Sequence, residues 1–535
     1  MALLVREQGC GVPSPAADVD DRRPPGDQAG PRAWTRAGVA AVAALTILGL
    51  VLRLHQLSSQ SLWLDEGLSA WIAEKDLPET LRWLIRADTH PPLYVGSLHF
   101  WTGVSDSVFW IRMFSVTAST LTIPVVCLLG RRLYDTRVAL LAGSFVAVSP
   151  FAVRWGQNAR PYALLGLLAM LANYGLVRTL QSPTRASRVL YFLSVAALLY
   201  THNIGGWIVA LTHVIILWPL RLSGKAGATA GLRCVVGGLL AWAAWLPALV
   251  SQVRGGGAHW LRNPSASDMR ELVVSFVSQG LPAAPSTAVV ALLLVLAGGL
   301  VILGLLARRG HTVTMLIVVA LLVGPVVLEL DAAVIQSVFL DRTLISVSIV
   351  FLLVLAAGLA SLTRTAPGKA AAAALATLIV LSNATSLHQY YDLGDGQDVN
   401  ERWDLAASYV AARQSTPGDA ILFKANTSQL PFDYYYRRTA ATALPRFGVP
   451  CSLEACYRPE AHTTDDDKLR LGKELEPYER IWVVKRWWGN WDFSLDDALG
   501  DRAAAVFERA DVRDVGGVVV ELYVHTERGP GARAP

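Results

Sequence analysis

The residues able to do chemistry in this chain gather in short polar segments between long apolar ones. The densest is Ser61-Leu-Trp-Leu-Asp-Glu-Gly-Leu-Ser69, in which Asp65 and Glu66 follow apolar residues and precede a glycine. A carboxylate held beside an apolar surface suits a general base that acts on a substrate presented there. The same pair at a helix start would also simply favour the helix dipole. The dipeptide alone therefore does not establish a catalytic role.

Four other segments carry polar groups of the same kind: 88–94, 154–162, 200–203 and 339–342. Two prolines in 88–94 fix an extended entry into the following helix. Arginines open helices in 154–162 and in 339–342, where the helix dipole disfavours a cation unless an anion lies nearby. The candidate substrate-binding residues are Asp88, His90, Gln157, Asn158, Arg160, Tyr162, His202, Asp341 and Arg342.

The composition shows what must position these groups. Of 535 residues, 53% are apolar and only 17% are charged. A soluble protein carries roughly a quarter charged residues, so the composition excludes a single large soluble enzyme and indicates a polytopic membrane protein. The formal net charge of +5 is too small to indicate a nucleic-acid partner. No Walker motif and no strand–GxGxxG–helix unit points to a soluble nucleotide cofactor.

Nearly charge-free segments, each about as long as a bilayer requires, recur from Arg36 onward. We expect about eleven to thirteen transmembrane helices, since 91–104 could also cross and 272–306 could hold more than one helix. The eleven clear spans are 37–54, 112–130, 138–153, 161–180, 187–203, 205–221, 232–250, 284–306, 312–330, 343–363 and 370–387.

Two further apolar helices, 68–85 and 91–104, are too short or too charged to be clear spans. We expect them to lie in the membrane interface, where tryptophan is enriched. They and the residues just after them would expose Trp71, Trp83, Trp101 and Trp110 at headgroup level.

Basic residues predict the orientation, because short loops rich in Lys and Arg stay in the cytoplasm. With the N-terminus inside, the basic segments 131–137, 178–188, 221–233, 308–309 and 364–369 all fall on the cytoplasmic side. The outer side then receives the loops 55–111, 154–160, 202–204, 251–283 and 331–342 and the tail from about 387.

This orientation predicts three parts in a multi-pass plasma-membrane protein. Residues 1–32 are rich in proline and charge and are expected to form a disordered cytoplasmic tail. Residues 33–387 form a transmembrane bundle whose first outer loop, 55–111, is the candidate catalytic loop because it carries Asp65 and Glu66. Residues 388–535 form a soluble extracytoplasmic α/β domain.

The predicted outer domain has more frequent charges and short apolar stretches that indicate strands, at 420–423, 481–484 and 518–524. Segment 401–413 has helical spacing. Cys451 and Cys456 would pair in an oxidising compartment or remain free thiols. The Trp-rich stretch 482–491, which includes Trp487, Trp488 and Trp491, could stack on sugar rings, but an aromatic core or membrane contact is favoured.

The order of the polar motifs resembles that of one family. Trp-Leu-Asp-Glu, then His-Pro-Pro-Leu-Tyr, then Gln-Asn-Ala-Arg-Pro-Tyr-Ala-Leu and Tyr-Thr-His-Asn are similar to the GT-C fold membrane glycosyltransferases of family 39. These are relatives of protein O-mannosyltransferases and lipid A aminoarabinose transferases. The resemblance covers 36–205 well and 330–437 more weakly, where the Asp-Arg-Thr-Leu at 341–344 looks like the family's Arg-Tyr-Leu.

The resemblance implies a polyprenyl-phosphate-linked sugar donor and an inverting transfer to an acceptor hydroxyl on the outer face. Asp65 matches the family's catalytic carboxylate, and Glu66 would support it or orient the acceptor. His90 matches a contact to the donor phosphate or the acceptor. Arg160 and Arg342 would neutralise the leaving phosphate, and such positioning and charge stabilisation can carry most of a group transfer.

Two departures from the family pattern leave part of this open. Asn158 stands where the family usually has Glu, and Thr343 stands where it usually has Tyr. Donor identity and a possible divalent metal therefore stay undecided. Mannose, arabinose, galactose and glucose donors all fit, and the acceptor hydroxyl could belong to a protein, a cell-wall polysaccharide or a glycolipid.

The alternatives are a non-catalytic lipid-linked glycan transporter and a glycan-binding assembly subunit. A transporter predicts ionisable residues inside the bundle on both sides of the midplane. In this sequence they cluster at one end of the spans, which favours an enzyme. Intact Asp65, His90 and Arg160 argue against a degenerate subunit.

Overall fold

The structure is a computed structural model, and it describes residues 33–528 with internal gaps. The residues outside the description are 1–32, 87, 255–262, 278–286, 308–310, 336–338, 393–400, 416, 454–463, 487–494, 500–504 and 529–535. The predicted N-terminal tail therefore lies outside the described residues, as do Cys456, Trp487, Trp488 and Trp491.

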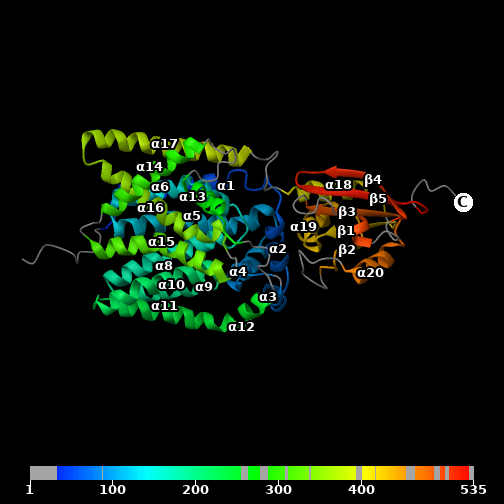
Figure 1. Ribbon diagram of the computed structural model, residues 1–535, viewed down its shortest axis with the longest axis horizontal. Coiled ribbons are helices and arrows are strands. Elements are labelled where there is room, and N and C mark those ends of the chain that lie inside the picture. Colours follow the sequence, from blue (N-terminus) through cyan, green and yellow to red (C-terminus); the bar gives the residue numbers. More distant parts are fainter. Residues whose placement is uncertain are drawn as a thin grey trace, which may run out of the picture.

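Helices form the first part of the chain, and they run side by side as a bundle (Figure 1). They are α1 (Arg36–Leu54), α2 (Leu64–Ala73), α3 (Leu77–Arg86), α4 (Pro92–Thr102), α5 (Val108–Leu133), α6 (Thr136–Val148), α7 (Pro150–Gly156), α8 (Tyr162–Gln181), α9 (Arg185–Leu199), α10 (Asn203–Leu222), α11 (Ala228–Trp242), α12 (Leu246–Arg254), α13 (Ala266–Val277), α14 (Thr287–Leu306), α15 (Thr312–Ile335), α16 (Ile345–Leu362) and α17 (Ala366–Asp392). Short 3₁₀ turns, η1 (Ala243–Trp245) and η2 (Asp341–Leu344), precede α12 and α16.

Side-chain caps start several of these helices. Thr35, Ser107, Asp135 and Thr184 each accept a hydrogen bond from a backbone N–H in the first turn of α1, α5, α6 and α9. Such caps satisfy donors that a helix end leaves without partners. Ser149 caps α7 in the same way, and Pro150 follows it, so α6 and α7 meet at a bend of 57°.

Among the described residues, eight helices are long and apolar enough to cross a membrane, or nine if α6 and α7 form one bent span. Each of the eleven predicted spans coincides with a helix or with a bent or continued pair of helices. Two predicted spans are not among these: α9 has only 15 residues, and in α14, which has 20 residues, the unbroken stretch of described side chains is Leu294–Leu306. The fold class is confirmed, and the expected eleven to thirteen spans exceed those that qualify by length and composition.

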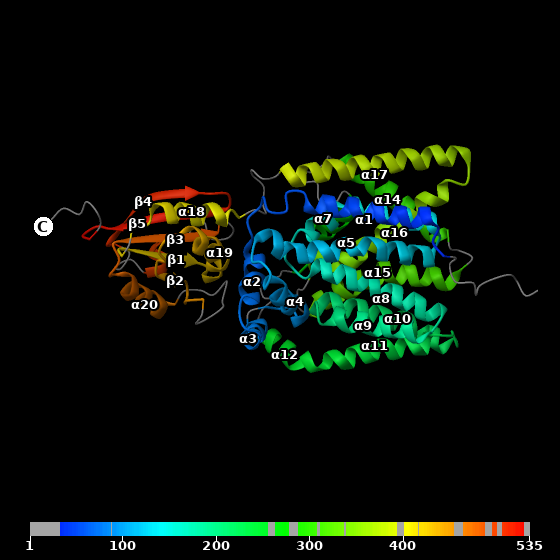
Figure 2. The same cartoon turned by 180° about the vertical axis from the view of Figure 1, so that it is seen from behind.

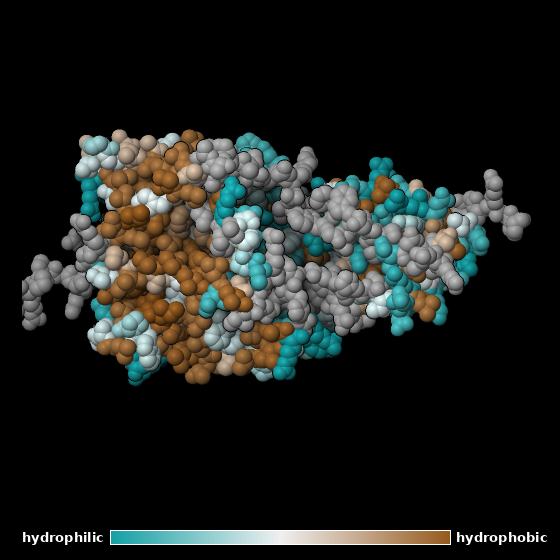
Figure 3. All heavy atoms as spheres, viewed as in Figure 1, coloured by the Kyte–Doolittle hydropathy of each residue, from teal (hydrophilic) through white to brown (hydrophobic). Residues whose placement is uncertain are grey.

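The apolar surface is concentrated on the bundle. In Figure 3, hydrophobic residues cover the bundle as a broad band, whereas hydrophilic residues dominate the described surface of the C-terminal domain. Large apolar side chains of the bundle that are exposed include Ile47, Val51, Leu240 and Val295. Such a surface is unfavourable in water and matches the acyl region of a bilayer.

The first connection of the bundle folds as three short helices, α2, α3 and α4. The predicted single helix at 68–85 is wrong, because α2 ends at Ala73 and α3 begins at Leu77. Asp76 starts α3 by accepting a hydrogen bond from Glu79 N at 2.8 Å. Trp83 is buried in the protein, so its expected exposure at headgroup level is also wrong.

The C-terminal domain is an α/β sandwich, as predicted. Its elements are α18 (Trp403–Arg413), β1 (Asp419–Lys424), η4 (Asn426–Ser428), α19 (Gln429–Thr439), β2 (Arg446–Gly448), α20 (Asp465–Leu475), β3 (Arg480–Arg486), α21 (Leu495–Leu499), β4 (Phe507–Asp514) and β5 (Val518–His525). The described strands form one sheet in the order β2-β1-β3-β5-β4. The strands β2, β1 and β3 are parallel to one another, and β5 is antiparallel to both of its neighbours, β3 and β4.

Alternation along the strands buries both faces of this sheet. In β1, Ala420 and Leu422 pack with α20 and α21, whereas Ile421 and Phe423 pack with α18 and α19. Trp482 is fully buried on the second face and donates its indole N–H to Asp419 at 2.9 Å. Trp482 is therefore a core residue, as the aromatic-core interpretation predicts.

The C-terminal domain lies against α2 at one end of the bundle, as the views from both sides show (Figures 1 and 2). A Cβ atom added to Gly67 would lie 2.9 Å from the backbone nitrogen of Pro431 in α19. Cys451 in this domain is disulfide-bonded. The two parts of the chain are thus in direct contact through the helix that carries Asp65.

Small residues let α14 and α16 approach closely. A Cβ on Gly358 would lie 2.0 Å from the carbonyl oxygen of Leu300, and one on Gly304 would lie 2.3 Å from that of Val354. Gly358→Ala should therefore separate the two helices and lower stability by about 1–3 kcal/mol. The measurement is the thermal unfolding temperature of the purified protein in detergent. Gly299→Ala, which adds a methyl group where nothing lies within 4 Å, is the control and should leave that temperature unchanged.

Candidate active site

The helix α2 presents Asp65 in its first turn. The helix begins after Trp63, which has extended backbone angles and provides no side-chain hydrogen bond of its own to the cap. The Asp65 side chain is 31% exposed, while that of Glu66 is completely buried. Asp65 is therefore open to a substrate, and Glu66 is not.

Glu66 forms a bidentate ion pair with Arg112 of α5. The carboxylate oxygens accept from Arg112 Nε at 2.9 Å and from Nη2 at 2.6 Å. A third hydrogen bond comes from the backbone N–H of Ala159 at 2.7 Å. Arg112 also donates to the carbonyls of Leu57, Gln60 and Ser61. Glu66 thus fixes the polypeptide around Asp65.

Arg160 is the cation nearest to Asp65. It lies in the turn between α7 and α8, is 4% exposed, and donates to Ser69 Oγ at 3.0 Å and to the backbone oxygen of Asp65 at 3.2 Å. Its guanidinium is 3.9 Å from a carboxylate oxygen of Asp65 and 3.9 Å from one of Asp88. Burial lowers the pKa of Arg160, but the two carboxylates raise it above its ordinary value, so the group stays charged.

Asp88 and His90 form the next layer of the site. Asp88 Oδ1 accepts from the backbone N–H of Thr89 at 2.7 Å and lies 2.5 Å from His90 Nδ1. Burial raises the pKa of Asp88, but His90 and Arg160 lower it more, so that it lies well below its ordinary range. Because this carboxylate is ionised, it holds the proton on Nδ1 of His90 and orients the ring.

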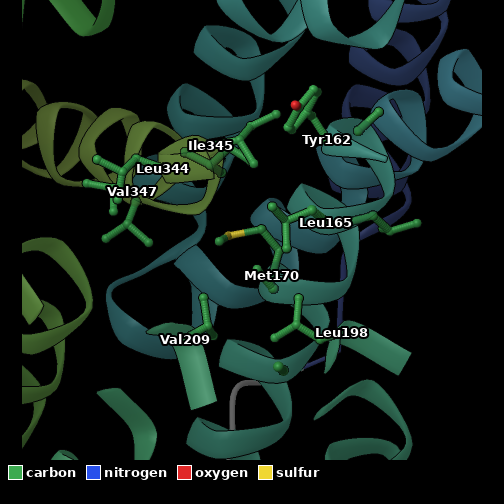
Figure 4. Close-up of a cluster of buried hydrophobic side chains, with 14 of the residues drawn as sticks. Tyr162, Leu165, Met170, Leu198, Val209, Leu344, Ile345 and Val347 are labelled. Carbon is green, nitrogen blue, oxygen red and sulfur yellow. The ribbon is translucent and has the colours of Figure 1, made fainter. Parts of the chain in front are cut away.

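Three aromatic or cationic groups complete the cluster. The rings of His90 and His202 lie 4.8 Å apart, and that of Tyr162 lies 5.7 Å from His202. Arg342 Nε donates to the Tyr162 hydroxyl at 2.9 Å, and its guanidinium lies over the ring of Trp155 at 5.6 Å. Tyr162 also borders the apolar side chains beneath the site, among them Leu165 and Ile345 (Figure 4).

The structure brings together Asp65, Asp88, His90, Arg160, Tyr162, His202 and Arg342. Three other candidate residues form hydrogen bonds with neighbouring groups. Gln157 donates to the carbonyls of Arg53 and His55. Asn158 accepts the indole N–H of Trp63 at 3.1 Å, and Asp341 accepts the backbone N–H of Arg342 at 2.7 Å.

A divalent metal, left open by the sequence, has no evident set of ligands in the described part of the chain. No group of three or more His, Cys, Asp or Glu residues is placed to hold a metal ion there. The two carboxylates of the cluster, Asp65 and Asp88, face Arg160 instead.

Sequence reasoning missed Ser69 and Arg112. Ser69 carried no distinguishing signal, since a serine on a short helix is common. Arg112 did carry one, because an arginine inside an apolar segment must pair with an acid or with backbone carbonyls. Its partner, 46 positions away, could not be chosen from the sequence.

Arg112→Ala should destabilise the protein strongly. The change leaves the fully buried Glu66 carboxylate without its counter-ion, which costs about 3–5 kcal/mol for a broken buried pair. Thermal unfolding in detergent measures the effect. Arg132→Ala removes an arginine of the same helix that makes an exposed hydrogen bond to Gln181 and serves as the control. Equal unfolding temperatures for the two variants would contradict the role of the buried pair.

His202 should make stability fall in mild acid. Burial, together with the neighbouring His90, Arg160 and Arg342, lowers its pKa well below 6.5, despite the opposing charge of Asp88. Below pH 6.5 the unfolded chain binds the proton and the folded chain does not, so each pH unit costs up to about 1.4 kcal/mol.

The test is His202→Asn, which keeps a cap for the backbone N–H of Gly205 but cannot take up the proton. Unfolding temperatures between pH 7 and pH 5 should fall less for the variant than for the wild type. Parallel pH profiles would show that His202 does not cause the loss.

Part of this chain matches a known protein family, and its fold is similar to that of solved structures. Residues 89–250 match the family described as dolichyl-phosphate-mannose-protein mannosyltransferase. None of the curated proteins compared by sequence matches the chain. ArnT from Cupriavidus metallidurans in the apo state is similar in structure, with a TM-score of 0.59 at 16% identity over 92% of this chain and 100% of that one.

Two other solved structures are also similar to this chain. ArnT bound to undecaprenyl phosphate has a TM-score of 0.59 at 14% identity, covering 94% of this chain and 100% of that chain. The Archaeoglobus fulgidus oligosaccharyltransferase in the apo form has a TM-score of 0.55 at 12% identity, covering 88% of this chain and 73% of that chain. The protein therefore has the GT-C fold of these membrane glycosyltransferases, and its residues 89–250 carry the segment typical of the dolichyl-phosphate-mannose-protein mannosyltransferase family.

Proposed function

We propose that this protein is an integral-membrane glycosyltransferase that moves a sugar from a polyprenyl-phosphate donor to an acceptor hydroxyl with inversion at C1. The sugar would be mannose-like or a pentose, and the acceptor a glycan, glycolipid or protein hydroxyl. The observation that carries the proposal is the partly exposed carboxylate of Asp65, set beside the buried cation of Arg160. A base and an anion-binding group then face the same substrate.

In the proposed step, the acceptor oxygen forms a bond to C1 of the sugar while the bond from C1 to the phosphate oxygen breaks. Asp65 takes the proton of the acceptor hydroxyl. The electron pair of the broken bond stays on the polyprenyl phosphate, whose negative charge Arg160 and Arg342 stabilise. Attack opposite the leaving group inverts the configuration at C1.

The surroundings of His90 and Arg342 also suit the donor phosphate. His90 is oriented by Asp88 through its Nδ1, which leaves the other ring nitrogen for a ligand. Arg342 is half-buried beside Tyr162, at the outer start of α16. The donor class is supported by the similar fold of ArnT, which has been solved with undecaprenyl phosphate bound.

The location we propose is the plasma membrane, with the N-terminus in the cytoplasm and the C-terminal domain outside. The distribution of Lys and Arg between the loops supports this orientation. The disulfide of Cys451 also supports it, since disulfides persist in oxidising compartments and are rare in the cytosol.

Asp65→Asn should abolish sugar transfer while the protein still inserts into membranes. The amide has the size of the carboxylate but cannot take a proton, so we expect a loss of kcat of at least about a hundredfold. Protein in liposomes is supplied with synthetic polyprenyl phosphates that carry mannose, arabinose, galactose or glucose. Membranes from cells that lack the protein provide the acceptor, and release of polyprenyl phosphate is measured.

Asp331→Asn changes an exposed carboxylate of α15 and serves as the control, with unchanged turnover expected. Near-full turnover by Asp65→Asn would show that Asp65 is not the base. If the wild type releases no polyprenyl phosphate from any donor but moves a labelled lipid-linked glycan across the bilayer, the transporter alternative replaces the enzyme.

A further inference from the structure

Glu401, at the start of the C-terminal domain, caps a backbone N–H at the beginning of α2. The backbone N–H of Leu64, the residue before Asp65, donates to Glu401 Oε2 at 3.1 Å, although the two residues are 337 positions apart. A helix start leaves several backbone donors without partners. The Glu66 carboxylate serves the preceding N–H of Trp63 only at 3.4 Å. Glu401 is therefore the closer acceptor at this helix end.

Glu401 is itself rigidly held. It is 8% exposed, and its Oε2 also accepts the indole N–H of Trp403 at 2.7 Å. Its other oxygen accepts from Arg486 Nε at 2.6 Å. Trp403 starts α18 and Arg486 ends β3, so the position of the carboxylate is determined by the core of the C-terminal domain.

Neighbouring contacts hold the same stretch of chain from the same side. The backbone N–H of Leu62 donates to the hydroxyl of Tyr435 in α19 at 2.8 Å. Gly67 lies so close to Pro431 that a Cβ atom would reach within 2.9 Å of its backbone. Residues 62–67 are thus bound by the C-terminal domain on one side and by Arg112 of the bundle on the other.

We propose that Glu401 is a positioning residue for Asp65, so that the C-terminal domain completes the active site of the bundle. This inference rests on the proposed function. Glu401 does not contact the reacting groups. It fixes the backbone of the turn from which Asp65 projects, and small displacements of a positioned group are costly to turnover.

The test compares Glu401→Ala with Glu401→Gln, whose amide oxygen can still accept from Leu64. For Glu401→Ala we expect a tenfold to hundredfold lower kcat, on the order that misplacement of a base produces. The KM for the polyprenyl-phosphate sugar should stay within about twofold, since the groups assigned to the phosphate belong to the bundle. Glu401→Gln should recover part of kcat.

A second measurement does not depend on activity. Hydrogen–deuterium exchange of the segment 62–68 should be at least about tenfold faster in Glu401→Ala than in the wild type, and close to the wild type in Glu401→Gln. The matched control is Arg437→Ala, which removes an exposed contact between the same two parts, the ion pair with Glu74 at 2.9 Å. It should change neither exchange at 62–68 nor kcat.

The outcomes separate the two proposals. Unchanged exchange at 62–68 in Glu401→Ala, or an unchanged kcat, overturns the positioning role. An equal rise in KM and fall in kcat, with a lower unfolding temperature, also overturns it, because it indicates general damage. If the wild type transfers no sugar but exchange at 62–68 responds as expected, the positioning of Asp65 stands and the proposed function fails.

Discussion

The buried ion pair between Glu66 and Arg112 is the interaction on which the rest of the site depends. Two charges without access to water are tolerated only when they meet each other with good geometry and with further hydrogen bonds. Here the carboxylate also accepts from Ala159 N, and the guanidinium also donates to three carbonyls of the first connection. One pair thereby joins α2, α5 and the segment that carries Arg160.

Much of this arrangement could be predicted from the sequence. Among the described residues, hydropathy located each helix that is long and apolar enough to cross a membrane, because a bilayer sets both the length and the composition of a crossing helix. The motif residues were expected to converge, and Asp65, Asp88, His90, Arg160, Tyr162, His202 and Arg342 do so. The strands of the C-terminal domain were recognisable as short apolar stretches, since each face of the sheet is buried.

The remainder could not be predicted, because it depends on distant partners. Arg53 lies within the first predicted span, yet it is fully buried and donates to Ser119 and to carbonyls of α6. The same holds for His213 of α10, which lies between Tyr191 and Asn173. The bundle interior is thus less free of polar groups than its hydropathy indicates. Gln157 and Asn158 belong to a recognisable motif, but their side chains serve the neighbouring backbone and Trp63.

The close approach of Gly67 to Pro431 has a consequence for engineering and for evolution. The boundary between the two parts of the chain is clear along the sequence, but it does not separate two independent modules. A chimera that exchanges the C-terminal domain alone would set a foreign surface against α2, where even a methyl group on residue 67 has no room. The exchangeable unit is the C-terminal domain together with the first connection of the bundle. Substitutions that change the shape of α19 should accordingly be tolerated only together with substitutions in the stretch 62–67 that it contacts.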